Sequence, residues 1–198
     1  MTDVLAATAE GIARASALLT AGEVVAFPTD TVYGVGVAAS RRDRLPALFE
    51  LKARPLDRLI PMLVADLSQA AGWEADARAH ALAEAFWPGA LTLVLGGHDG
   101  TQAFRAPDHP LTLELIRAAG PLLATSANRS GEPDTLGADE VLVAFAGQQD
   151  ELAAVLDGGR VPGGVASTVV DLSVTPARIL RQGPIGADEL GTLIDLAR

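Results

Sequence analysis

The apolar positions of this chain change their spacing within its first thirty residues. From residue 8 to 19 they recur every three or four positions, and Gly22 follows, which predicts a helix with a glycine at its end. Residues 24–27 are then all apolar, and Pro28 closes the run. A short continuous apolar run that stops at proline is typical of a buried strand.

This change between helical and extended patterns continues to the end of the chain. Further helices are predicted at 45–52, 74–86, 110–119, 138–145 and 187–196. Further strands are predicted at 32–37, 60–64, 91–95, 121–124, 153–156, 167–172 and 178–180. Several short strands in succession indicate an α/β fold with a twisted mixed parallel and antiparallel sheet flanked by helices. Since no linker or repeat interrupts the 198 residues, a single domain over 1–198 is expected.

Charge and cysteine content limit the classes of protein to which this chain can belong. The net charge of −10 opposes unaided binding to nucleic acid, because such binding needs many cations against phosphates. The absence of cysteine excludes disulfides and thiolate metal sites, and the three histidines have no metal-ligand spacing. No apolar run reaches the roughly 18 residues of a membrane span. A cytoplasmic protein is expected, without a metal of its own.

Lysine usage singles out one position. Of the 15 Lys and Arg residues, only Lys52 is a lysine, and Arg54 stands two residues beyond it. An ammonium is a compact charge that suits phosphate oxygens, whereas a guanidinium forms paired hydrogen bonds. Because Pro55 disfavours helical geometry at Arg54, both cations are expected where a helix ends. The alternative is a lone surface lysine.

Three polar segments follow predicted strands, where open α/β sheets usually carry their sites. They are 28–34, 125–128 and 167–168, and they supply hydroxyl and amide groups for phosphate, ribose or carboxylate oxygens. The same residue types also form turns and helix caps. Arg105, after a short strand, is a candidate clamp for a substrate carboxylate, with an ion pair to Asp108 as the alternative.

The glycine patterns do not decide which segment would bind a phosphate. The chain has no G-x-x-x-x-G-K-[ST] sequence, and the pair at 34 and 36 lacks the third glycine of a dinucleotide turn. The glycine-rich segment 157–164 can let a phosphate approach the backbone, or it can be a flexible hairpin connection.

Seven motifs occur in an order that resembles the YrdC/TsaC family of threonylcarbamoyl-AMP synthases. They are P-T-[DE]-T-x-Y-G at 28–34, K-x-R-P at 52–55, W-P-G-x-x-T at 87–92, R-x-P-x-H-P at 105–110, T-S-A-N-x-S-G at 125–131, S-T-V-V-D at 167–171 and I-L-R-x-G at 179–183. Each motif is weak alone, but their order is specific and spans nearly the whole chain. The resemblance implies a YrdC-like fold and synthesis of threonylcarbamoyl-AMP and pyrophosphate from L-threonine, bicarbonate and ATP, for threonylcarbamoyladenosine modification of tRNA.

The resemblance also implies the residues of the site. Lys52 and Arg54 would be catalytic. The ATP-binding residues would be Lys52, Arg54, Arg58, Thr101, Ser126, Asn128 and Arg181. The threonine-binding residues would be Thr31, Tyr33, Arg105, Ala124 and Ser167. Magnesium would arrive with ATP.

Two positions depart from the family's pattern. Asp30 stands where glutamate is common, a small change if the carboxylate faces solvent. Leu63 stands where longer members place a substrate-facing histidine.

Two alternatives remain open. One is a protein of the same fold that acts on another acyl or carbamoyl adenylate, related to the carbamoyl-transfer module of hydrogenase maturation. The other is an RNA-binding module, which the charge of −10 and the few aromatic residues disfavour. The expected partners are the tRNA threonylcarbamoyl transferase machinery downstream, with weak or no direct tRNA binding and no membrane.

Overall fold

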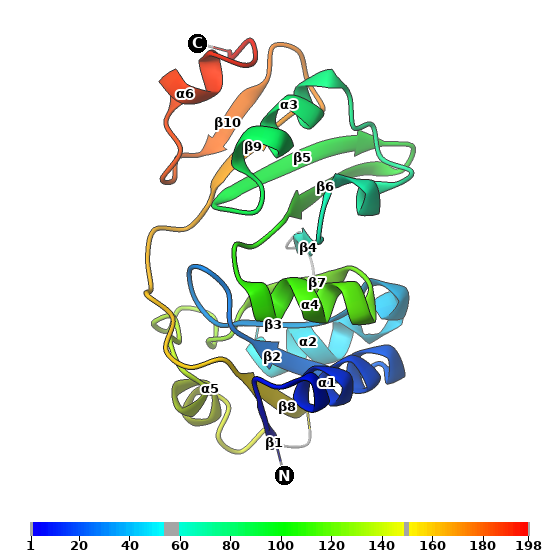
Figure 1. The fold of residues 1–198 in the computed structure, drawn as a ribbon, viewed down its shortest axis with the longest axis vertical. Helices are drawn as coiled ribbons and strands as arrows, with labels where there is room; N and C mark the ends of the chain where they lie inside the picture. Colours follow the sequence, from blue (N-terminus) through cyan, green and yellow to red (C-terminus); the bar gives the residue numbers. More distant parts are fainter. Residues whose placement is uncertain (1, 54–59, 149–150, 198) are drawn as a thin grey trace.

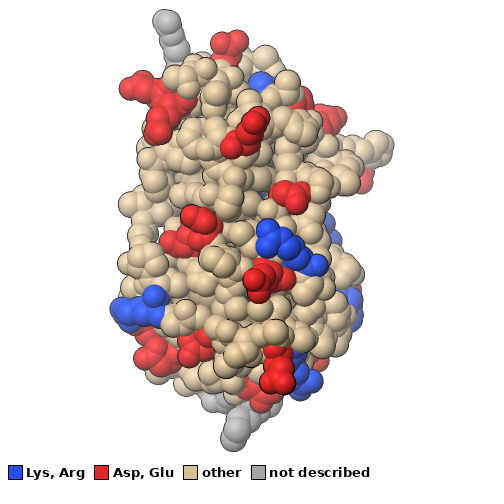
Figure 2. Space-filling model, in the orientation of Figure 1, with Lys and Arg blue, Asp and Glu red and all other residues tan. Residues whose placement is uncertain are grey.

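The computed structural model of the protein describes residues 2–53, 60–148 and 151–197. Ten strands among these residues form one sheet, in the order β1-β8-β2-β3-β7-β4-β6-β5-β9-β10. Figure 1 shows the sheet running along the long axis of the molecule, with the two termini at opposite ends. Figure 2 shows acidic side chains on both halves of the same face, as the net charge of −10 predicts.

The bounds of the elements agree with most of the predicted ones. The strands are β1 Asp3–Ala6, β2 Val24–Phe27, β3 Gly34–Ala38, β4 Met62–Leu63, β5 Leu91–Gly97, β6 Gly100–Arg105, β7 Leu122–Ser126, β8 Leu152–Asp157, β9 Thr168–Asp171 and β10 Arg178–Arg181. The α-helices are α1 Ala9–Ala21, α2 Leu45–Lys52, α3 Ala77–Phe86, α4 Pro110–Ala119, α5 Ala138–Ala144 and α6 Ala187–Gly191. Short 3₁₀ helices cover Ala39–Arg44 and Leu67–Ala70. No helix within the described ranges is both long and apolar enough to cross a membrane.

The expected mixed sheet is confirmed by the strand directions. β8 is parallel to β1 and β2, and β9 is parallel to β5. The pairs β2–β3, β3–β7, β4–β7, β5–β6 and β9–β10 are antiparallel. The sheet therefore needs both tight returns and long crossovers, and the crossovers carry helices over its faces.

Helices α1 and α4 lie together over one face of the sheet (Figure 1). The side chain of Thr8 accepts a hydrogen bond from the N–H of Gly11 and caps α1, which ends at Gly22 with a φ of 93°. Leu19 of α1 and Leu115 of α4 are fully buried in the cluster on this face. Burying one leucine side chain contributes about 1.5–3 kcal/mol, so this pair fixes both helices against the strands.

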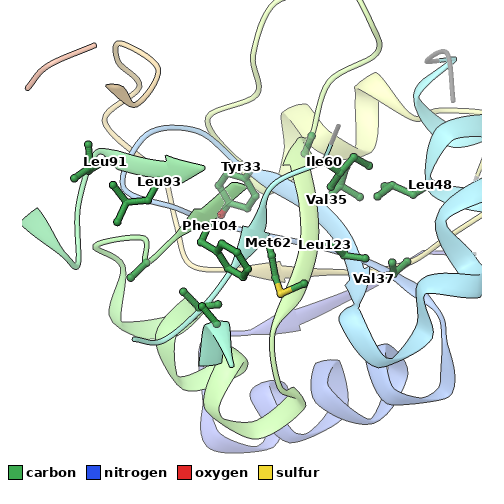
Figure 3. Packing of buried hydrophobic residues seen from close by; sticks show 14 of the residues in the cluster. Tyr33, Val35, Val37, Leu48, Ile60, Met62, Leu91, Leu93, Phe104 and Leu123 are labelled. Carbon is green, nitrogen blue, oxygen red and sulfur yellow. The ribbon is translucent and has the colours of Figure 1, made fainter. Parts of the chain in front are cut away.

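The opposite face carries the larger core. Figure 3 shows Val35, Leu123 and Met62, from the neighbouring strands β3, β7 and β4, in this cluster with Leu48 of α2. On β7 the flanking Leu122 belongs to the cluster on the first face. This alternation is the period of two expected for a strand buried on both faces.

Several parts of the chain differ from the sequence-based expectation. β1 was not anticipated, and β6 was expected only as a short strand of unstated bounds before Arg105. α6 stops at Gly191 because the chain then runs alongside residue 177 instead of continuing as a helix. β4 is only two residues long, since Pro61 before it has no N–H to donate to a neighbouring strand. The segment 158–164 is not a hairpin connection, because β8 and β9 lie far apart in the sheet.

Candidate functional site

A cleft of about 500 Å³ opens over the middle of the sheet. Its walls come from the segment between β2 and β3, from strands β4 to β7, and from the segment that leads into β9. The predicted site residues that line it are Thr31, Arg105, Ala124, Ser126, Ser167 and Arg181. Six positions spread over about 150 residues of sequence are thus brought to one place.

Lys52 is the last residue of α2, and its side chain is only 3% exposed. Its ammonium donates hydrogen bonds to the carbonyl of Ser126 and to Oδ1 of Asn128, at 3.3 Å for the latter. Ser126 Oγ donates to the same Oδ1 at 2.6 Å, and Asn128 Nδ2 donates to the carbonyl of Glu132 at 2.6 Å. A buried ammonium needs such partners. The surface-lysine alternative is therefore wrong, and the predicted lysine, serine and asparagine form one network.

Arg105 ends β6, and its guanidinium is held from two sides. Nε donates to the carbonyl of Gly89 at 3.0 Å, and Nη2 lies 2.7 Å from both carboxylate oxygens of Asp30. The side chains of Arg105 and Asp30 are 11% and 16% exposed. Arg105 thus pairs with Asp30 and not with Asp108, so that alternative is wrong. The condition for a small effect of aspartate at position 30, a carboxylate that faces solvent, is not met, because the turn after β2 packs this carboxylate against the end of β6.

Arg181, at the end of β10, reaches the same cleft from the other side. Its Nε donates to the carbonyl of Ser167 at 3.0 Å and its Nη2 to Ser167 Oγ at 3.1 Å. Burial, and next the nearby positive charge of Arg105, lower the pKa of Arg181 below the ordinary arginine value. The positive charges of the two guanidinium groups repel each other in a cleft that is partly shielded from water. An anion bound between them would relieve this repulsion.

Thr92 is a cleft residue that the predicted site did not include. Its hydroxyl lies 2.8 Å from Ser167 Oγ in a buried contact, and Thr92 lines the cleft. The signal in the sequence was the last position of the W-P-G-x-x-T motif, which was recognised but given no role. Thr92 and Arg181 together hold the hydroxyl of Ser167.

Close backbone packing fixes Arg181 relative to Ser167. A Cβ added to Gly183 would lie 2.4 Å from the carbonyl oxygen of Ala166 and 2.4 Å from the amide nitrogen of Thr168. The Thr168 hydroxyl accepts hydrogen bonds from the N–H groups of Gly183 and Ile185, at 3.0 and 3.1 Å. The glycine of the I-L-R-x-G motif is therefore required by contact between the two segments.

Thr29 builds the turn that carries Thr31 and Asp30. Its Oγ1 accepts from the N–H of Thr31 at 3.2 Å and donates to the carbonyl of Val32 at 2.7 Å. The Oγ1 atoms of Thr29 and Thr31 are 3.1 Å apart. A threonine that hydrogen-bonds its own backbone two and three residues on is typical of such a turn. Thr31 is held at the cleft wall as a result.

Tyr33 does not line the cleft. Its side chain is fully buried, and its hydroxyl donates to the carbonyl of Gly159 at 2.7 Å and accepts from the N–H of Gly158 at 3.2 Å. Burial is the main cause that raises the pKa of Tyr33, to about 12. The side chain therefore anchors the 158–164 segment, and contact between Tyr33 and threonine stays a prediction that this geometry does not favour.

Thr101 is also outside the cleft. It pairs with Gly96 near the free end of the β5–β6 hairpin and is exposed. Side chains alternate along a strand, so Thr101 shares a face with Ala103 and Arg105, which line the cleft. Four residues of strand separate Thr101 from Arg105 by about 13 Å. Its assignment to ATP stays a prediction.

Two further predicted residues, Arg54 and Arg58, lie outside the described residues. Lys52, whose network lies beside the cleft, precedes them in the chain, and Pro61, which lines the cleft, follows them. The roles of both arginines stay predictions.

A second hollow, of about 680 Å³, lies beside the cleft and shares Asp134 with it. Its other charged lining residues are Arg129, Glu132, Asp139 and Glu140. Four carboxylates against one guanidinium repel an anionic ligand. No group of three or more side chains suited to a metal ion occurs in the described part of the chain. The cleft with the two arginines is therefore the better candidate for an anionic substrate.

The fold and this cleft together define a class: an α/β protein whose mixed sheet carries a cleft lined by two arginines, with a buried lysine nearby. The chain belongs to the Sua5/YciO/YrdC family, whose model, described as "Telomere recombination", matches residues 17–183.

Relatives of known name support the same assignment. The chain is 40% identical to a threonylcarbamoyl-AMP synthase of Bacillus subtilis over 98% of this chain and 59% of the relative. It is 35% identical to a putative threonylcarbamoyl-AMP synthase of Mycobacterium tuberculosis over 93% of this chain and 89% of the relative. The chain thus spans less than two thirds of the first relative and most of the second.

Solved structures give the same picture of the fold. Sua5 of P. abyssi, complexed with L-threonine, matches all of this chain and 62% of its own with a TM-score of 0.88 and 33% identity. YciO of E. coli matches 96% of this chain and 100% of its own with a TM-score of 0.83 at 22% identity, which shows the shared fold alone. The YrdC-like fold expected from the motifs is confirmed.

Proposed function

We propose that this protein is a threonylcarbamoyl-AMP synthase, which makes threonylcarbamoyl-AMP and pyrophosphate from L-threonine, bicarbonate and ATP. The observation that carries the proposal is the meeting of Arg105 and Arg181 in one cleft, with the Lys52 network beside it. Relatives that bear this name, and a neighbour with L-threonine bound, support the choice among anionic substrates. We propose that residues 1–198 act as one unit, because the cleft takes its walls from strands throughout the sheet.

The threonine side of the site is assigned to the wall around Arg105. A guanidinium binds a carboxylate through two N–H groups, so Arg105 would hold the threonine carboxylate. Thr31, Ala124 and Ser167 line the same cleft and would surround the rest of the amino acid. Thr92, which contacts Ser167 Oγ, would position that hydroxyl.

The nucleotide side is assigned to Lys52, Ser126, Asn128 and Arg181. Lys52 and Arg181 would neutralise negative charge on the triphosphate, and Mg²⁺ would enter as part of the substrate MgATP. Arg54, by its place in the K-x-R motif, would join them in the catalytic step, and Arg58 would bind the nucleotide.

The reaction needs no covalent bond to the protein. The threonine amine would combine with bicarbonate to give a carbamate and water. A carbamate oxygen would then attack the α-phosphorus of ATP, and pyrophosphate would leave. The protein would align the two anions and stabilise the charge that develops on the phosphoryl oxygens, which is the role of preorganised cations in such transfers.

The proposed setting is the cytoplasm, where the product would pass to the tRNA threonylcarbamoyl transferase machinery. Direct tRNA binding is expected to be weak or absent, because the net charge is −10 and acidic groups occur on both halves of the face in Figure 2.

The test is release of pyrophosphate from MgATP with L-threonine and bicarbonate each present or omitted. The proposal expects release only when both are present. Release that ignores threonine would support the alternative of another acyl or carbamoyl adenylate. Salt-sensitive tRNA binding with no pyrophosphate release under any condition would favour the RNA-binding alternative.

The variant Lys52→Met tests, in the same assay, whether the ammonium of Lys52 takes part in catalysis. The methionine keeps an apolar side chain of similar length and removes the ammonium. Loss of one charged transition-state contact typically lowers kcat by about 100- to 1000-fold. Arg117→Gln is the matched control, since Arg117 is exposed on α4 and away from the cleft. Equal activity of the two folded variants would show that Lys52 has no part in catalysis.

A further inference from the structure

The cleft contains its own carboxylate. Asp30 lies with both oxygens 2.7 Å from Nη2 of Arg105, in a pair that is largely buried. Asp30 thus occupies the kind of position that the carboxylate of a bound amino acid would take. Arg181 has Ser167 as its hydrogen-bond partner and no carboxylate in contact among the described residues.

The hydrogen bonds of Arg105 limit how a second carboxylate can bind. Nε is used by the carbonyl of Gly89, and Nη2 by Asp30. A paired hydrogen bond from a guanidinium needs two nitrogens on one side. An incoming carboxylate can therefore use Nη1 freely but must share Nη2 with Asp30. The ligand carboxylate and the Asp30 carboxylate are forced close together on one guanidinium.

The turn around Asp30 limits its retreat. Thr29 fixes the backbone on both sides of Asp30 through its hydrogen bonds to Thr31 and Val32. The aspartate side chain is short, so its carboxylate stays near Arg105 even when a ligand enters. Burial lowers the pKa of His109, against a smaller opposing effect of the Asp30 charge, so its imidazole favours the neutral form and supplies no compensating charge.

We propose that Asp30 is the residue that selects an α-amino acid over other carboxylic acids, by pairing with the substrate ammonium while Arg105 holds the substrate carboxylate. This inference rests on the proposed function and names the recognition element of its amino-acid site. An α-amino acid adds one negative and one positive charge, so each charge in the site keeps a partner. A carboxylic acid without the amine places two carboxylates on one guanidinium, and like charges at such short range disfavour binding.

The test compares two ligands that differ only in the amine. L-Threonine and (R)-3-hydroxybutanoate share the carboxylate, the hydroxyl and the methyl group. Their dissociation constants are measured by calorimetry with the wild-type protein and with Asp30→Asn, which keeps the shape and removes the charge. Asp108→Asn is the matched control, because Asp108 is an exposed carboxylate three residues from Arg105 that is not paired with it.

The wild-type protein and Asp108→Asn should prefer threonine strongly. In Asp30→Asn the preference should fall by about 10- to 100-fold, since removing one charge of a desolvated pair changes affinity on that scale. Binding of (R)-3-hydroxybutanoate should become tighter, a gain that a merely misfolded variant cannot show. Asp30→Glu should retain part of the preference.

Failures of the two proposals are distinguishable. If the wild-type protein binds threonine and Asp30→Asn keeps the same preference, Asp30 is not the selecting residue, while the proposed function stands. If Asp30→Asn loses affinity for both ligands by the same factor, Asp30 only supports the fold of the site, and the inference is overturned. If the wild-type protein binds neither ligand and releases no pyrophosphate, both proposals fail.

Discussion

Replacing Tyr33 with phenylalanine should loosen the segment at 158–164 and leave the core filled. The ring remains, and only the hydroxyl is lost, which donates to the carbonyl of Gly159 and accepts from the N–H of Gly158. These two partner groups belong to half-buried Gly158 and exposed Gly159 and can bind water in the variant, so the loss is that of an ordinary hydrogen bond, about 0.5–1.5 kcal/mol. The free energy of unfolding should therefore fall by about that amount at neutral pH.

The pKa of Tyr33 gives a second measure of the same interaction. Burial, with a smaller effect of the Asp157 carboxylate, outweighs the Gly158 N–H and raises the pKa to about 12. An exposed tyrosine has a pKa of about 10, and the difference corresponds to about 3 kcal/mol. Because the raised pKa belongs to the folded state, this stability is complete below about pH 10 and is lost as the pH rises towards about 12. The stability difference between wild type and Tyr33→Phe should shrink over that range.

The assay is direct because the chain has a single tyrosine. Phenolate absorbance during an alkaline titration therefore reports Tyr33 alone, and circular dichroism on the same samples shows whether the fold persists. The folded protein should titrate near pH 12 and the denatured protein near pH 10. Urea unfolding of wild type and Tyr33→Phe at two pH values gives the free energies. A folded protein that titrates near pH 10, or a variant as stable as wild type at neutral pH, would refute the assigned role of this hydroxyl.

Two further predictions concern stability. Gly183→Ala should lower the free energy of unfolding by about 1–3 kcal/mol and raise the KM for threonine, because its Cβ would meet backbone atoms at 2.4 Å. Gly191→Ala, where nothing lies within 4 Å, is the control and should be neutral or stabilising in the same urea titration. Burial, against smaller opposing effects of Asp30 and Asp108, lowers the pKa of His109, so unfolding takes up a proton in mild acid. Stability present above about pH 6.5 should therefore be lost as the pH falls, and His109→Leu should flatten this dependence between about pH 5.5 and 7; an unchanged slope would contradict the assignment.

Local signals made the helices predictable. Thr8 and Gly22 mark the two ends of α1, and each acts on backbone groups within a few residues of itself. Such signals need no knowledge of the rest of the fold. By contrast, β1 is four residues with an exposed, partly polar pattern, and it exists because β8 lies beside it. No local pattern reveals that partner.

The candidate site was likewise predicted only in part. Motif order placed Arg105, Arg181, Ser126 and Ser167 correctly at one cleft. The pairing of Asp30 with Arg105 was missed because the two residues are 75 positions apart, and a carboxylate at the end of a turn is usually solvated. Pairing across such a separation depends on how the strands are ordered, which residue spacing does not encode. The roles of the individual cleft residues stay predictions for the assays described above.

The strand order also has a consequence for synthesis on the ribosome. β8 lies between β1 and β2, so the N-terminal strand stays without its neighbour until residues 152–157 have left the exit tunnel. β9, the neighbour of β5, and the strand that carries Arg181 come later still. Contacts between distant parts of a chain form slowly, because long loops must close first. The cleft, which Ser167, Val169 and Arg181 help to line, is therefore completed only after residue 181 has left the tunnel.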